Sequence, residues 1–283
     1  MSEQWTIQRT LEWCRGYLEK HGDENPRLSA EWLLSAATGL SRLNLYVNFD
    51  KPLSMEERDV LRESLKRRGQ GEPLQYITGE SGFRHIVVRT ASGVLIPRPE
   101  TELLVQAALD YFEGAQQTVR ALEVGTGTGC IACSLAKEAG MEVLATDISD
   151  DAVACAKRNV SALGLDDLVE VRKTDCAEGV EGAFDLLISN PPYIPTAVME
   201  TLPHEVSGFE PHLALDGGAD GLEFFDRLVN EGLVLVREGG LFACELHETC
   251  LEEAQRRLVD AGLHDVRIID DLAGKHRHIV AVV

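Results

Sequence analysis

The chain has 283 residues, of which 44% are hydrophobic and 26% are charged. This composition is ordinary for a globular protein and excludes a disordered, collagen-like or fibrous chain. The length suits one large domain plus a smaller one. With 27 basic and 47 acidic residues, the formal net charge is −20. Such a charge disfavours tight binding to duplex DNA, because Lys and Arg contacts to phosphates supply most of that affinity.

The charge is shared unevenly along the chain. Residues 1–75 hold 11 basic and 12 acidic residues, a net of −1, and residues 76–283 hold the other 16 and 35, a net of −19. We therefore expect two units with different surfaces. The N-terminus shows no secretory or transit signal, no apolar run is long enough to span a membrane, and the seven cysteines follow no disulfide spacing. These features predict a cytoplasmic protein with reduced thiols and no membrane partner.

Residues 1–73 are predicted to form a helical domain. One helix is expected over about 26–40, and a second begins where Ser54 and Glu57 fit a capping box and ends near Gly69. Two interpretations stay open: a small bundle that simply folds, or a module that docks a partner.

Residues 74–97 are predicted to form a β-hairpin linker. The segments 76–79 and 86–89 are rich in β-forming residues and are broken by glycines. Pro97 then stops a strand from continuing, and Pro99 suits the first turn of a helix that runs through Leu109.

From residue 119 onward, strands and helices alternate, which predicts an α/β domain with a mainly parallel sheet covered on both faces. The expected strands are 119–124, 142–148, 169–174, 185–189, 241–246, 266–269 and 278–283. The expected helices are 129–139, 150–163, 221–237 and 248–261. The last two strands can pair as a hairpin, which would make one edge strand antiparallel.

A glycine-rich segment, Leu-Glu-Val-Gly-Thr-Gly-Thr-Gly at 122–129, lies where a strand turns into a helix. Glycines permit a tight turn and a close approach to a ligand. Asp147 follows Gly127 by 20 residues, at the end of the next strand, where a carboxylate can accept both hydroxyls of a ribose. An adenosine-bearing cofactor is therefore expected. The third glycine, Gly129, comes one position too early for the dinucleotide pattern, and no phosphate-binding Gly-Lys-Ser/Thr loop is present.

The form Glu-x-Gly-x-Gly-x-Gly resembles the first motif of S-adenosylmethionine-dependent methyltransferases. This resemblance implies that Glu123 lies near the amino-acid end of the cofactor, that Asp147 binds its ribose, and that Asp175 and Cys176 lie near its adenine. The implied cofactor-binding residues are Glu123, Val124, Gly125, Thr126, Gly127, Asp147, Cys176 and Asn190. Cys130 and Cys133 lack a second pair of ligands, so we expect packing residues there and no metal site.

The tetrad Asn190, Pro191, Pro192 and Tyr193 follows the apolar strand 185–189, at the sheet edge where open α/β folds bind ligands. An amide or aromatic amine nitrogen is a poor nucleophile because its lone pair is delocalised. The Asn190 oxygen and the Pro191 carbonyl can accept its two N–H bonds and aim its lone pair at a sulfonium methyl. Tyr193 can pack on the planar group, and no dedicated base is needed. Two acceptors remain possible: a base amino group such as N6 of adenine, which the acidic charge disfavours, and a glutamine amide.

Six segments in this order resemble the PrmC/HemK family, the release factor glutamine methyltransferases, over nearly the whole chain. They are Pro73–Glu80, Val94–Glu102, the Gly125 loop, Ser189–Tyr193, Glu210–Gly218 and Asp271–Gly274. The resemblance implies an N-terminal substrate-docking helical bundle (1–73), a hairpin linker (74–97) and a class I methyltransferase domain with a seven-stranded sheet (98–283).

The same resemblance implies a substrate and a reaction. A methyl group passes from S-adenosylmethionine to the amide N5 of the glutamine in the Gly-Gly-Gln motif of peptide chain release factors, which modulates translation termination. A sister group that acts on a ribosomal protein typically reads I/V-P-R-S-P, whereas residues 96–100 here read Ile-Pro-Arg-Pro-Glu, which favours release factors. Asn190, Pro191 and Tyr193 are the implied catalytic residues, and Asn190–Tyr193 contact the substrate. We expect a monomer that contacts no nucleic acid directly.

Overall fold

A computed structural model gives the structure of residues 4–283. The chain divides into two compact units. The first comprises the described residues up to Glu80 together with His204–Phe209, and the second comprises Ser81–Pro203 and Glu210–Val283. The residues of the segment 204–209 thus belong to the first unit although the sequence on either side of them belongs to the second.

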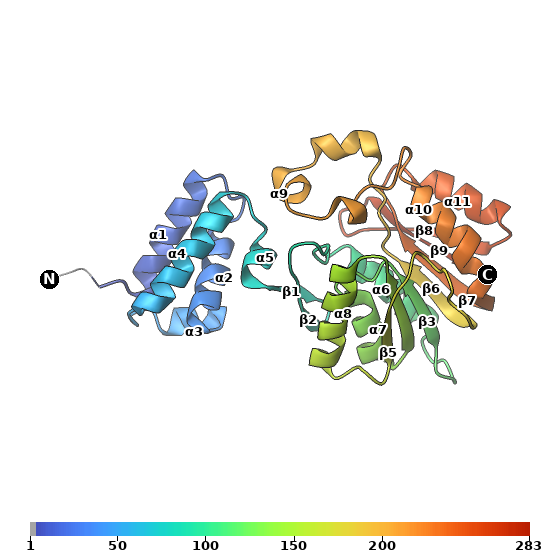
Figure 1. Cartoon of the computed structure of the whole chain (residues 1–283), viewed down its shortest axis with the longest axis horizontal. Coiled ribbons are helices and arrows are strands. Elements are labelled where there is room, and N and C mark those ends of the chain that lie inside the picture. The colour runs from blue at the N-terminus through green and yellow to red at the C-terminus, as the bar shows by residue number, and fades with distance from the viewer. Residues whose placement is uncertain (1–3) are drawn as a thin grey trace. The chain divides into compact units, whose positions relative to one another are not determined.

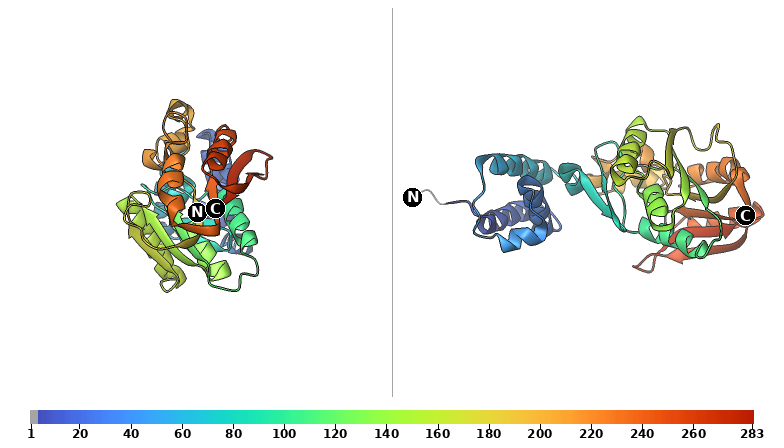
Figure 2. Two further views of the ribbon diagram at one scale, coloured as in Figure 1. Left: turned by 90° about the vertical axis from the view of Figure 1, so that its right-hand side faces the viewer. Right: turned by 90° about the horizontal axis from the view of Figure 1, so that it is seen from below.

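Helices make up the first unit over residues 4–80, and Figures 1 and 2 show them packed side by side. They are α1 (Ile7–Lys20), α2 (Pro26–Thr38), α3 (Arg42–Val47), α4 (Met55–Gly69) and α5 (Leu74–Thr78). Their core is built from apolar side chains that include Ile7, Leu18, Leu33, Leu34 and Leu45. The capping box of α4 is confirmed: Glu57 N–H donates to Ser54 Oγ (3.1 Å), and Ser54 N–H donates to Glu57 Oε2 (2.7 Å).

Residues 74–78 form the helix α5, so the expectation of β structure at 76–79 is wrong. Leu74 and Ile77, three residues apart, both pack against the core of the first unit, and Gly79 ends the helix in the left-handed conformation with φ of 77°. This apolar face and the glycine cap outweigh the β propensity of the intervening residues. The hairpin follows directly as β1 (Glu80–Phe83) and β2 (Ile86–Arg89).

The second unit contains a seven-stranded sheet (Figure 1) with the strand order β5-β4-β3-β6-β7-β9-β8. The strands are β3 (Arg120–Val124), β4 (Glu142–Asp147), β5 (Val169–Lys173), β6 (Phe184–Ser189), β7 (Val236–Glu245), β8 (His264–Asp270) and β9 (His276–Val282). Neighbours from β5 to β7 run parallel. The strand order reverses between β3 and β6, which creates a crevice at their carboxyl ends.

The antiparallel strand is the internal β9, so the expectation of an antiparallel edge strand is wrong. β9 pairs antiparallel with both β7 and β8, and β8 at the edge therefore runs in the same direction as β7. Burial explains the order, because residues 278–282 of β9 are buried whereas no residue of β8 is. The apolar strand occupies the covered position and the polar strand takes the solvent edge.

Helices cover both faces of this sheet (Figure 1). α6 (Thr101–Tyr111), α7 (Cys130–Ala139) and α8 (Asp150–Leu163) pack on one face, and α10 (Glu223–Arg227) and α11 (Leu251–Asp260) on the other. The helix expected over 221–237 is present over residues 223–235 but is not a regular α-helix: α10 passes directly into a π turn, Leu228–Gly232, and a 3₁₀ turn, Leu233–Leu235. Among the described residues, no helix has the length and apolarity that a membrane crossing requires.

Candidate active site

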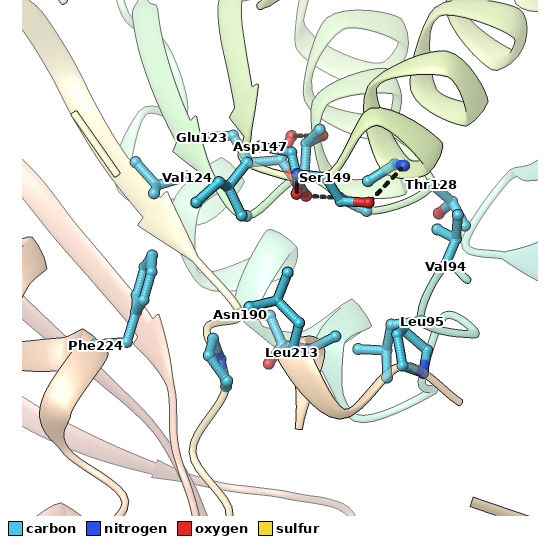
Figure 3. Close-up of a pocket in the computed structure, with 18 of the residues that line it drawn as sticks. Val94, Leu95, Glu123, Val124, Thr128, Asp147, Ser149, Asn190, Leu213 and Phe224 are labelled. Atoms are coloured by element: carbon cyan, nitrogen blue, oxygen red, sulfur yellow. Dashed lines mark hydrogen bonds between the residues drawn. The ribbon is translucent and has the colours of Figure 1, made fainter. Parts of the chain in front are cut away.

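A cavity of about 360 Å³ opens at the carboxyl ends of β3, β4 and β6. All of its lining residues belong to the second unit. Figure 3 shows Glu123, Val124 and Asp147 on one side of the cavity, with Asn190 and Leu213 across from them in that view. The turn after β3, the end of β4 and the turn after β6 therefore meet in one place, as the sequence predicts.

The glycine turn after β3 is held by backbone hydrogen bonds and left-handed residues. Gly125 and Thr126 both donate their N–H groups to the Thr146 carbonyl, each at 2.9 Å. Gly125, Gly127 and Gly129 have φ values of 77°, 55° and 78°, which residues with a side chain rarely adopt. At Gly129 a Cβ would also lie 3.2 Å from the Cβ of Ala156. The third glycine is thus needed for the close packing of α7 on α8.

Glu123 is a buried carboxyl group with one unused oxygen. Its side chain is 1% exposed, and Oε2 accepts hydrogen bonds from Thr126 Oγ1 (2.8 Å) and Ala132 N (3.1 Å). Burial raises the pKa of Glu123 from 4.5 to about 8. Oε1 has no hydrogen-bond partner within residues 4–283. Because Glu123 lines the cavity, this orphaned oxygen fits a ligand that carries a cationic or N–H group.

Asp147 is fixed by two backbone N–H groups. Gly127 N donates to Oδ2 and Ser149 N donates to Oδ1, both at 2.9 Å. Burial raises the pKa of the Asp147 carboxyl, and the backbone hydrogen bonds oppose this shift. Each oxygen keeps a lone pair for a further donor, so the group suits a vicinal diol such as a ribose.

Phe224 and Cys176 give one part of the cavity wall an aromatic and apolar surface. Phe224 and Cys176 both line the cavity, and Cys176 adopts a positive φ of 50°. Burial raises the pKa of the Cys176 thiol to about 11. Asp175 forms an ion pair with Arg227 at 2.6 Å, and the Arg227 guanidinium lies 5.6 Å from the centre of the Phe224 ring. An aromatic ring beside polar groups is a surface on which a planar base can stack.

Asn190 presents an unused acceptor to the cavity that it lines. Its Nδ2 donates to Thr101 Oγ1 at 3.0 Å, and within the described chain no donor reaches its Oδ1 or the carbonyl oxygen of Pro191. Two acceptor oxygens of adjacent residues are therefore available at this turn.

Pro192 lines the cavity, but Pro191 and Tyr193 are not among its lining residues. The Tyr193 ring packs against the core on one face of the sheet, and its hydroxyl donates to Glu245 Oε1 at 2.9 Å. Burial and the neighbouring Glu245 raise the pKa of Tyr193 well above 10. Tyr193 is thus a protonated donor that fixes the turn from behind.

A second segment, residues 215–218, pairs with the Asn190 turn. Ile194 N donates to Leu215 O, Gly217 N to Ile194 O and Thr196 N to Gly218 O, each at 2.9 Å. A Cβ on Gly217 would lie 2.6 Å from the Cα of Tyr193, a distance that real Cβ atoms do not tolerate. Only glycine therefore permits this approach.

Four residues that contribute to the site were not predicted from the sequence: Thr101, Gly217, Phe224 and Glu245. Thr101 and Gly217 lie inside the segments Val94–Glu102 and Glu210–Gly218, which mark them without giving their roles. Phe224 and Glu245 carried no sequence signal, since only the folded sheet brings them to the turn. Cys130 and Cys133 lie in the core of the second unit, and the described residues contain no cluster of three or more His, Cys, Asp or Glu side chains that could hold a metal ion.

The sheet order, the glycine turn and the acidic residue ending β4 define a class I methyltransferase. Residues 9–79 match the family model described as PrmC N-terminal domain, and residues 99–204 match the Methyltransferase small domain. The hMettl16 catalytic domain in complex with MAT2A 3'UTR hairpin 6 has a TM-score of 0.58 and 21% identity over 80% of each chain. This likeness concerns the fold alone.

Curated relatives narrow the class to one family. The release factor glutamine methyltransferase of Geobacter sulfurreducens is 45% identical over 246 residues, which cover 86% of this chain and 85% of that protein. The one from Rhodopirellula baltica is 40% identical over 281 residues, which cover 96% and 95%. The chain belongs to the release factor glutamine methyltransferase family. As an enzyme of this family, it uses S-adenosylmethionine as the methyl donor.

Proposed function

We propose that this protein transfers a methyl group from S-adenosylmethionine to the side-chain amide nitrogen, N5, of the glutamine in the Gly-Gly-Gln motif of peptide chain release factors. One observation carries the proposal: the cavity joins an adenosine-type site to Asn190, whose side-chain oxygen is an unused acceptor. The names and coverage of the curated relatives support the same substrate.

The residues of the cavity fit the cofactor. S-adenosylmethionine supplies an electrophilic methyl group on a sulfonium sulfur. We assign its binding to the residues predicted from the sequence: Glu123, Val124, Gly125, Thr126, Gly127, Asp147, Cys176 and Asn190. The orphaned Oε1 of Glu123 suits the amino-acid end, the carboxylate of Asp147 suits the ribose, and Phe224 with Cys176 suits the adenine.

The acceptor chemistry follows from the Asn190 turn. The Asn190 Oδ1 and Pro191 carbonyl oxygens can each accept one N–H bond of a substrate carboxamide, which orients the nitrogen lone pair toward the methyl group. Both prolines limit movement of this turn. Pro192 lines the cavity beside the substrate, and Tyr193 holds the turn through Glu245. No base is required, because methylation makes the nitrogen acidic enough to release its proton.

The remaining parts of the proposal concern the whole chain. We assign substrate docking to the N-terminal helices, predicted as residues 1–73, with the segment 74–97 as linker and 98–283 as the catalytic domain. The site needs one copy of the chain, since one unit supplies every lining residue, which favours a monomer. A release-factor substrate favours action in the cytoplasm. The net charge of −19 over residues 76–283 disfavours a nucleic-acid substrate.

Incubation of the full chain with a release factor and S-adenosylmethionine tests the proposal. Peptide mass spectrometry is expected to find one added methyl group on the glutamine of Gly-Gly-Gln. The Asn190→Ala variant should still fold while its kcat falls at least about 100-fold, because one of two amide acceptors is lost. A methyl group found instead on a ribosomal protein or on adenine would contradict the proposed substrate.

A further inference from the structure

Behind the Asn190 turn lies a buried group of three polar side chains to which the chemistry above gives no direct part in methyl transfer. Thr101, Glu245 and His278 are 2%, 1% and 0% exposed. They come from the start of α6, the end of β7 and the internal strand β9, and Glu245 and His278 face each other in the β7–β9 register. Such deeply buried polar groups are costly unless they are paired, so their arrangement calls for a role.

The Glu245 carboxyl group receives two hydroxyl hydrogens. Thr101 Oγ1 donates to Oε2 at 2.7 Å, and the Tyr193 hydroxyl donates to Oε1 at 2.9 Å. The Nε2 atom of His278 lies 3.6 Å from Oε2, beyond hydrogen-bond distance, and neither ring nitrogen has a hydrogen-bond partner among the described residues. Glu245 therefore touches both Thr101 and Tyr193, while Asn190 is reached only through Thr101.

A hydroxyl group has a single hydrogen, and this fixes the polarity of the next bond. Because Thr101 gives its hydrogen to Glu245, only a lone pair of its oxygen remains for Asn190. Asn190 must then turn its NH₂ group toward Thr101, as the Nδ2–Oγ1 distance of 3.0 Å records. The opposite end of the carboxamide, Oδ1, is thereby left for the cavity. With the amide turned over, two acceptor oxygens would face each other.

We propose that Glu245 is a positioning residue for methyl transfer: through Thr101 it determines that Asn190 presents its oxygen, and not its NH₂ group, to the substrate amide. The inference rests on the proposed function, since an acceptor is needed only when the substrate offers N–H bonds. A turned-over Asn190 would meet the substrate NH₂ group with an NH₂ group of its own. Through Tyr193, the same carboxylate holds the other end of the turn.

Four variants of the full chain test, by kinetics, the relay of hydrogen bonds that runs from Glu245 through Thr101 to Asn190. Thr101→Val removes the hydroxyl at constant shape, and Glu245→Gln offers one acceptor oxygen and a new donor to two hydroxyls. Both should lower kcat about 100-fold, with the cofactor Kd changed less than about threefold. Thr101→Ser keeps the relay and should stay within about threefold of the parent kcat. The control is Thr90→Val, which replaces a buried threonine whose hydroxyl has no partner among the described residues.

A readout independent of activity separates this inference from the proposed function. Hydrogen exchange of the Asn190 side-chain NH₂, assigned in NMR spectra by its loss in Asn190→Ala, should be slow in the parent chain and in Thr101→Ser. It should become at least about tenfold faster in Thr101→Val and Glu245→Gln, because the acceptor is lost or reversed. Unchanged exchange in both variants would overturn the inference even if the parent methylates a release factor. If exchange becomes faster in the two variants but the parent chain methylates no release factor, the result would count against the proposed function alone.

Discussion

Asp147 is oriented by the protein itself, through the N–H groups of Gly127 and Ser149. Asp147→Ala should therefore weaken S-adenosylmethionine binding by roughly 1.5–3 kcal/mol, because a charge-assisted acceptor for the ribose is removed. Isothermal titration calorimetry measures this loss directly. Asp150→Ala, which removes an exposed carboxylate from the first turn of α8, is the matched control and should bind normally. Unchanged affinity in Asp147→Ala would remove Asp147 from the site.

Glu123 makes the stability of the ligand-free protein depend on pH. Its pKa is about 8 in the folded chain against 4.5 as the ordinary value, so the folded state retains a proton that the unfolded state releases between these values. The contribution of this proton to the free energy of unfolding is fully present below about pH 4.5. It decreases as the pH rises above that value and is lost once the pH has risen through about 8. A pKa shift of this size corresponds to about 5 kcal/mol of unfolding free energy.

Glu123→Gln cannot ionise, so it should remove this component of the pH dependence. Urea unfolding of both proteins at about pH 5 and about pH 8.5 gives the comparison. The parent chain is expected to lose more unfolding free energy than the variant between the two conditions. Equal losses in the two proteins would mean that Glu123 titrates normally in the folded chain.

Among structural elements, the pairing of residues 192–196 with 215–218 determines the shape of the catalytic turn. Gly217→Ala would place a methyl group 2.6 Å from the backbone of Tyr193, and backbone atoms cannot move aside as a flexible side chain can. We expect a loss of about 1–3 kcal/mol of unfolding free energy from overpacking, together with a lower kcat. Gly82→Ala is the control, since a Cβ there meets nothing within 4 Å. Parent-like stability and rate in Gly217→Ala would show that the turn tolerates displacement.

The parts of the site that could be predicted from the sequence are those marked by local sequence signals. The glycine turn, Asp147 and Asn190 each lie directly after an apolar strand, so their meeting at one sheet edge follows from the alternation of strands and helices. Thr101 and Glu245 could not be found in this way, because they are 89 and 55 residues from Asn190 and only the folded domain brings them close to it. The errors at 76–79 and at β9 share a cause: burial against distant residues outweighed local propensity.

For the whole molecule, the open question is what the helical unit contributes. A chain beginning at Ser81, after α5, should still bind S-adenosylmethionine, because every residue lining the cavity lies in the second unit. It should lose most of its kcat/KM for an intact release factor, since selection of a protein partner needs a total interface on the order of 1,200 Å². A cut before Pro73 would be a poorer test, because α5 would lose the core that Leu74 and Ile77 pack against.

Activity on a short Gly-Gly-Gln peptide is the control for this truncation and should change little. The shortened chain also lacks the partners of residues 204–209, such as Arg68, which forms an ion pair with Glu205 at 2.9 Å. Circular dichroism and cofactor titration therefore accompany the kinetics. Full activity of the shortened chain on the intact release factor would return the helices to a purely structural role.

The seven cysteines are all unpaired and buried, which gives the native chain a set of internal chemical reporters. Burial raises the pKa of Cys14 and of Cys133 to about 12, so an alkylating reagent meets almost no reactive thiolate until the surrounding structure opens. The labelling rate of each thiol then measures the opening free energy of its own neighbourhood. Cys14 reports on the helical unit, Cys244 on β7 and Cys176 on the cavity wall. A local stability map, and its response to a bound ligand, is thus accessible without changing a single residue.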